Sequence, residues 1–197
     1  SLARNDGKNL IRQERTDQIR QISFWLGDAL AYASATEAEP DGLVIHEAGP
    51  SRITFTSALP VEGVTGAGTV SAVTLVLGEE CWTGKNEGQE GVLRRCVQSP
   101  SVDSTGAAQP LCDYGSSGCE SKFDDFIVAR EVNDTRALFT YYFDDTSGLD
   151  PSHSVATEHL GNVIAVELKV TVAGVEADDR TEATVFKRYS INKWRRS

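Results

Sequence analysis

The sequence predicts an α+β fold in which one long N-terminal helix packs on a mainly antiparallel β-sheet. Apolar residues in the N-terminal segment recur at steps of three and four, whereas they alternate with polar residues after the turn at 39–42. No helical segment separates the later strands, so neighbouring strands are expected to pair antiparallel. The 197 residues suffice for one domain with a sizeable core. We expect a helical segment at 1–34 and a globular β-rich segment at 35–197.

The predicted helix has two halves of different character. Its first half holds three large apolar residues among many charged ones, and we expect this half to project from the domain; the three are Leu2, Leu10 and Ile11. Its second half carries one apolar stripe that is expected to pack on the sheet, formed by Ile19, Ile22, Leu26, Ala29, Leu30 and Ala33. A helix of about 32 residues would be about 48 Å long.

Strand-like segments follow the helix, and turn residues separate them. The predicted strands lie at 43–46, 52–56, 69–77, 92–97, 126–129, 138–143, 163–172 and 183–191. We expect 69–77 and 92–97 to pair across the Gly-rich loop between them. The segment 98–122 is rich in Ser, Gly, Asp and Pro, and we predict a loop there.

Four cysteines, at 81, 96, 112 and 119, allow three disulfide pairings. The pairing Cys81–Cys96 with Cys112–Cys119 is favoured because each bridge would close a Gly-rich loop. Disulfides indicate an oxidising compartment. The alternative is four free thiols in a cytosolic protein. A zinc site is less favoured, because structural zinc sites usually show closely paired ligands.

Charge and motifs argue against nucleic-acid binding and against catalysis. Acidic residues outnumber basic ones, 29 to 19, giving a formal net charge of −10, which repels nucleic acid and anionic membranes. The chain has no nucleophile elbow and no phosphate-binding Gly-Lys-Ser/Thr loop. His46, His153 and His159 lack the spacing of a zinc helix, and Asp113 with Asp124–Asp125 is expected to be solvated surface. We therefore expect no enzyme.

One segment has a weak resemblance to a calcium loop. Asp144, Thr146 and Asp150 place alternate oxygen atoms around Gly148. A plain turn is the favoured interpretation, because a bidentate acid is only loosely supplied by Glu158. No other cofactor is expected. The aromatic segment 139–143 is interpreted as a core strand rather than a stacking platform for nucleic acid.

Several segments, in their order, resemble the minor pilins of the PilW and PulJ type, within the type IV pilins and type II secretion pseudopilins. RQERTDQIRQISFWLGDALAYA at 12–33 is similar to the stretch that follows the membrane segment in that group. PDGLVIHEAGPSRITFTSAL at 40–59 resembles its first strand pair, and ALFTYYFDDTSGLDP at 137–151 resembles its aromatic turn motif. LGNVIAVELKVTV at 160–172 and TVFKRYSIN at 184–192 resemble its later strands.

The resemblance implies a structural subunit that primes or caps a type IV pilus or a type II secretion filament. The chain has no methionine and no apolar run long enough to cross a bilayer. We therefore expect a processed or truncated product whose missing N-terminal apolar helix anchors it in the inner or cytoplasmic membrane before assembly. Its partners would be other pilin or pseudopilin subunits, outside the cytoplasm. Leu2, Leu10 and Ile11 would then face the filament.

Two other functions stay open at this point. One is an adhesin-like binding module on a helical stalk, with the 98–122 loop and the acidic surface as contact regions. The other is an extracellular hydrolase, which would need a polar cleft near His153 or His159.

Overall fold

The computed structural model describes residues 2–33, 43–58, 70–101, 103–105, 109–172 and 183–191, except for the side chains of 2–6, 8, 12 and 183–186. In these ranges the chain forms one α-helix, eight β-strands and one short 3₁₀-helix. The elements are α1 (Leu2–Ala31), β1 (Ile45–Ala48), β2 (Arg52–Ser57), β3 (Ser71–Leu77), β4 (Leu93–Ser99), β5 (Lys122–Ala129), β6 (Phe139–Phe143), η1 (Thr157–Asn162), β7 (Val163–Val172) and β8 (Ala183–Ser190).

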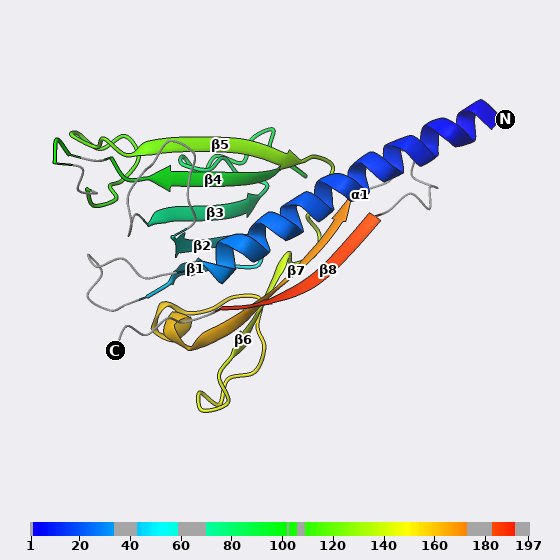
Figure 1. Cartoon of the computed structure of the whole chain (residues 1–197). Coiled ribbons are helices and arrows are strands. Elements are labelled where there is room, and N and C mark those ends of the chain that lie inside the picture. Colours follow the sequence, from blue (N-terminus) through cyan, green and yellow to red (C-terminus); the bar gives the residue numbers. More distant parts are fainter. Residues whose placement is uncertain are drawn as a thin grey trace.

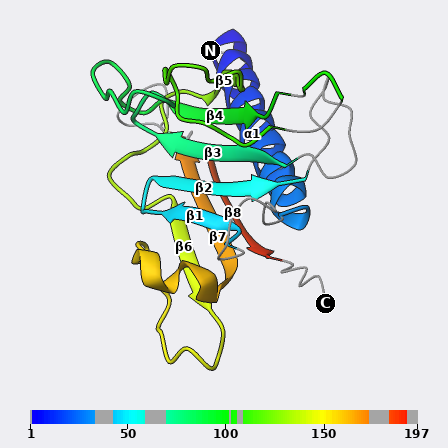
Figure 2. The ribbon, with the colours of Figure 1, turned by 90° about the vertical axis from the view of Figure 1, so that its left-hand side faces the viewer.

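The strands form two antiparallel sheets rather than the single sheet expected. The first has the order β1-β2-β3-β4-β5 and the second the order β6-β7-β8. Figure 2 shows the first sheet in front of α1, β7 and β8. The division falls after β5, where Val132 bridges to Val172 at the end of β7. The α+β class and the antiparallel pairing are confirmed, and so is the pairing of β3 with β4 across the loop that contains Cys81.

The second half of α1 is buried against both sheets. It contacts β8, β5 and β7 (Figure 1). The predicted stripe is the buried face: Ile19, Ile22, Leu26, Ala29, Leu30 and Ala33 are each exposed by 4% or less. They share one core with strand residues from both sheets. Full burial of an Ile or Leu side chain stabilises a fold by about 1.5–3 kcal/mol, so this half is firmly anchored.

Gly27 allows the close approach of α1 to β8. A Cβ atom on Gly27 would lie 2.7 Å from Cε1 of Tyr189. The hydroxyl of Tyr189 donates a hydrogen bond to the carbonyl of Ser23, one turn earlier on α1. The tyrosine ring therefore occupies the space that a side chain at position 27 would need.

Side chains alternate across the first sheet as the sequence predicts. Ile53 and Phe55 of β2 lie opposite Leu75 and Val73 of β3, and all four are in the core shared with α1. Thr54 lies opposite Thr74 on the other face. The face toward α1 is called the inner face below, and the opposite one the outer face.

The edge strand β5 begins at Lys122, four residues before the predicted start at 126. Its first half contains Asp124 and Asp125, which hide the strand pattern because aspartate is depleted in strands. Those charges are tolerated because β5 lies at the edge of the sheet and its side chains are largely exposed. The predicted loop is shortened accordingly, since β4 also extends to Ser99.

Candidate functional site

The N-terminal half of α1 extends beyond the sheets, as Figure 1 shows. Leu10 is 71% exposed and Ile11 is 37% exposed, in contrast to the stripe of the second half. The side chain of Leu2 lies outside the described residues. Single exposed leucines are common on protein surfaces, whereas two adjacent exposed apolar residues on a projecting helix form a candidate contact surface.

A groove of about 480 Å³ separates this half of α1 from the end of β5. Its walls include Ile11, Glu14 and Gln18 from the helix, and Ile127, Val128 and Arg130 from the strand end. Arg15 and Glu131 also line the groove and form an ion pair with each other. Glu131 has a φ of 58°, in the left-handed region that few residues other than glycine adopt. One end of the groove is thus formed by the left-handed backbone of Glu131 and by its ion pair with Arg15.

Beyond the groove, an arginine lies against two aromatic rings on the inner face. The guanidinium carbon of Arg95 is 4.6 Å from the ring centre of Trp25 on α1 and 4.7 Å from that of Phe126 on β5. Such cation–π contacts contribute from about 0.5 to 2 kcal/mol, depending on desolvation. The Nε atom of Arg95 is buried, and no described residue accepts a hydrogen bond from it. Burial lowers the pKa of Arg95 below its ordinary value, and the negative charge of Asp124 opposes that change.

The outer face is covered by two loops that disulfides close. The structure joins Cys81 to Cys96 and Cys112 to Cys119, the pairing favoured from the sequence, with Cα–Cα distances of 5.8 and 5.6 Å. All four cysteines are paired, which indicates an oxidising, extracytoplasmic compartment. The amide of Gln98 on β4 donates a hydrogen bond to the carbonyl of Cys112 and so fastens the second loop to the sheet.

Each disulfide loop also contributes one aromatic ring to a cluster on β5. The ring centre of Phe123 lies 5.0 Å from that of Trp82 and 5.2 Å from that of Tyr114, with both pairs edge-to-face. Edge-to-face pairs add about 0.5–1.5 kcal/mol beyond burial. The three rings come from distant parts of the chain, so no local pattern in the sequence indicates them. The cluster is partly exposed, and through Trp82 it packs against a small second core of Val76, Cys81 and Cys96.

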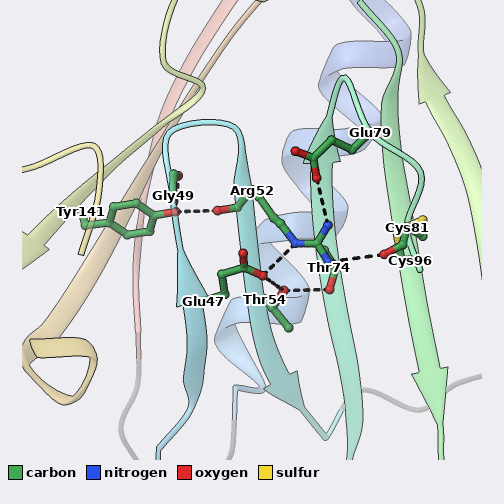
Figure 3. A network of polar contacts seen from close by, with 9 residues as sticks. All are labelled: Glu47, Gly49, Arg52, Thr54, Thr74, Glu79, Cys81, Cys96 and Tyr141. Carbon is green, nitrogen blue, oxygen red and sulfur yellow. Dashed lines mark hydrogen bonds and ion pairs between the residues drawn. A yellow bond between two sulfur atoms is a disulfide. The ribbon is translucent and has the colours of Figure 1, made fainter. Parts of the chain in front are cut away.

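A polar network joins the first disulfide loop to β1, β2 and β3 (Figure 3). The guanidinium of Arg52 donates to Glu47 at 2.7 Å, to Glu79 at 3.4 Å and to the carbonyl of Cys81 at 3.3 Å. Thr54 shares the carboxylate of Glu47. Every member that Figure 3 labels is satisfied by another, so the network is structural.

Tyr141 on β6 connects the second sheet to β1 and β2 of the first sheet. Its hydroxyl donates to the carbonyl of Gly49 at 2.9 Å and approaches that of Arg52 at 3.3 Å (Figure 3). Burial raises the pKa of Tyr141 above its ordinary value, and the nearby charge of Glu47 adds to the effect. The hydroxyl therefore stays protonated. Its hydrogen bonds tie β6 of the second sheet to the β1–β2 turn of the first sheet. Phe139 lies in the core with Tyr141, and Phe143 packs against it, as the core-strand interpretation expects.

The segment resembling a calcium loop is a hydrogen-bonded turn. Oδ1 of Asp144 accepts from the backbone amide of Thr146 at 3.1 Å and from its hydroxyl at 2.6 Å. The carbonyl of Asp144 accepts from the amide of Ser147 at 3.1 Å. Asp150 is exposed. Within the described ranges, no three His, Cys, Asp or Glu side chains are placed to hold a metal ion.

The histidines and the remaining acids lie apart from one another. His153 hydrogen-bonds the carbonyl of Phe139 at 2.7 Å, whereas His46 on β1 lies 3.4 Å from the hydroxyl of Thr56. His159 belongs to η1. Asp125 pairs with Arg94, whereas Asp124 is its neighbour on β5 and is directed to the opposite face. These contacts of His153 and His46 go to a carbonyl and a hydroxyl, and Asp125 is paired with an arginine.

No model of a known protein family matches the chain, and a search of curated proteins found no match. No helix in the described part of the chain is both long enough and apolar enough to span a membrane.

Proposed function

We propose that the protein is a structural subunit of an extracytoplasmic filament of the type IV pilin class, a minor pilin or pseudopilin that primes or caps assembly. The observation that carries the proposal is the contrast within α1: the apolar stripe from Ile19 to Leu30 is buried by its own domain, whereas Leu10 and Ile11, nearer the N-terminus of the same helix, are 71% and 37% exposed. A rod of this kind is useful where other helices cover its bare half.

The physical mechanism requires no chemistry. Burial of Leu10 and Ile11 by neighbouring helices would remove apolar surface from water, which favours association at about 25 cal/mol per Å² before entropic costs. The anchored half would transmit the position of the rod to the β-sheets. The two disulfides suit a domain that functions outside the cytoplasm, because they restrict its unfolded state.

Site-specific photo-crosslinking in the complete gene product, in its own host, tests the proposal. A photoreactive benzoylphenylalanine at Ile11 should capture other filament subunits. Ile164 on β7 is the matched control, because it has the same exposed fraction of 37% on a different part of the molecule. We expect a yield at position 11 at least about tenfold above that at position 164. Equal yields, or capture at position 11 of proteins outside the filament only, would contradict the assignment.

A further inference from the structure

We propose that the seam between α1 and β5 docks the projecting half of α1 from a second copy of this chain, with Arg95 receiving a carboxylate from that copy. The seam consists of Ile11, Gln18 and Trp25 on α1, and of Arg95 and Phe126 on the sheet. The inference rests on the proposed function, because it names the partner and the contact residues within the filament.

The seam is one continuous strip. Ile11, Gln18 and Trp25 are spaced by seven residues, close to two helical turns, so they lie along one flank of α1. That flank faces β5 along the groove at its N-terminal end and through Arg95 further on. The strip therefore starts at the exposed rod and continues onto the anchored domain, so a helix that covers the rod can extend along it.

The strand side of the seam is more apolar than a protected edge usually is. Phe126 is 46% exposed at the edge of the first sheet and lies opposite Arg95, on the same face. Ile127 is 41% exposed and lines the end of the groove, but it lies opposite Arg94. Edge strands commonly carry charges that discourage docking. In β5 those charges are confined to the first half, at Lys122, Asp124 and Asp125. The apolar second half is left open where it meets α1.

Arg95 determines which chemical group the seam would bind. Partly buried charges are normally paired and hydrogen-bonded. The described residues give the guanidinium two aromatic rings and the more distant charge of Asp124, but no acceptor for its buried Nε atom. Arginine binds carboxylates strongly, often through two parallel hydrogen bonds. The best occupant is thus a segment that carries a carboxylate beside an apolar side chain.

The projecting half of α1 has that chemistry. Glu14 follows the exposed Leu10 by four residues, so both lie on the same side of the helix. Two different sites of the chain would be complementary: Leu10 with Glu14 on the rod, and Arg95 with Phe126 on the sheet. Because the two sites differ, the contact between two copies is heterologous and joins them head to tail.

A charge exchange in the complete gene product tests the pairing. Benzoylphenylalanine replaces Phe126, and tagged and untagged copies are expressed together so that a homodimeric product can be identified. We expect Arg95→Glu and Glu14→Arg each to reduce that product at least about tenfold, and the double variant to restore it to within about threefold. Glu14 is exposed on the helix surface, so its variant stays informative even if Arg95→Glu disturbs the fold.

The neighbouring arginine provides the control. Arg94 lies on the outer face and pairs with Asp125, so Arg94→Gln should leave the crosslink unchanged, whereas Arg95→Gln should weaken it. No homodimer at position 126, or capture there of a different protein, would overturn the docking proposal. If position 11 still captures filament subunits in that case, the proposed function stands; if neither position captures a subunit, both proposals fail.

Discussion

The two halves of α1 are one continuous helix, yet they have opposite environments. From Ile19 to Leu30 the apolar stripe is buried against both sheets, whereas Leu10 and Ile11 are 71% and 37% exposed; Phe24 lies outside the stripe and is also exposed. Most of the stability of a helix in a protein comes from the packing of an apolar face. The exposed half has no such face within its own domain, so it continues the helix that the buried half anchors. The contrast separates residues that hold the fold from residues that the proposed assembly would cover.

The largest effect should come from removing a buried side chain of the anchored half. Leu26 is fully buried, so Leu26→Ala should lower the free energy of unfolding by about 2–5 kcal/mol through lost burial and a residual cavity. Leu10→Ala is the control in the exposed half and should change the free energy of unfolding by less than about 0.5 kcal/mol. Urea unfolding followed by circular dichroism measures both. Similar losses for the two variants would remove the distinction between the halves.

The two glycines of α1 give a matched pair for the second prediction. At Gly27 a methyl group would meet the ring of Tyr189, so Gly27→Ala should cost about 1–3 kcal/mol by overpacking. At Gly7 a Cβ atom would meet nothing within 4 Å, so Gly7→Ala should stabilise the exposed half by up to about 1 kcal/mol. Thermal unfolding of both variants tests whether the two stability changes have opposite signs. A stabilising Gly27→Ala would show that α1 does not lie this close to β8.

Much of this contrast is predictable from the sequence, because helical periodicity is a local signal. The apolar stripe from Ile19 onward identifies the anchored half, and the scarcity of apolar residues before it identifies the projecting half. The alternation in β7 likewise predicts its core residues. In β5, by contrast, Asp124 and Asp125 conceal the start of the strand, because an edge position tolerates charges that a central strand would exclude.

The division into two sheets and the seam depend on contacts between distant residues. The second sheet forms by the pairing of β7 with β6 and β8, and Val132 bridges to Val172 at its margin; no local pattern predicts that bridge. Arg95 resembles an ordinary solvent-facing strand residue in the sequence, since nothing near it indicates that Trp25 and Phe126 will lie against its guanidinium. The Cys81–Cys96 bridge is easier to predict, because it closes one short loop.

The smallest effect concerns the hydrogen bond that fastens the anchored half to β8. Tyr189→Phe removes the hydroxyl that donates to the carbonyl of Ser23 and should cost about 1 kcal/mol at neutral pH. Burial raises the pKa of Tyr189, so the neutral form is favoured in the folded state. Its contribution is therefore complete below the ordinary tyrosine pKa of about 10 and declines as pH rises beyond that value, where the unfolded chain ionises first.

The difference in the free energy of unfolding between wild type and Tyr189→Phe should thus become smaller above about pH 10. Tyr141 is retained in both proteins, so its own raised pKa contributes equally and cancels in the comparison. Urea unfolding at neutral and alkaline pH measures the difference. A gap that widens with pH would mean that the hydroxyl ionises more easily in the folded protein, which is incompatible with its burial against α1. Because Tyr189 also fills the space beside Gly27, the result reports directly on how tightly β8 holds the half of α1 from which the exposed rod extends.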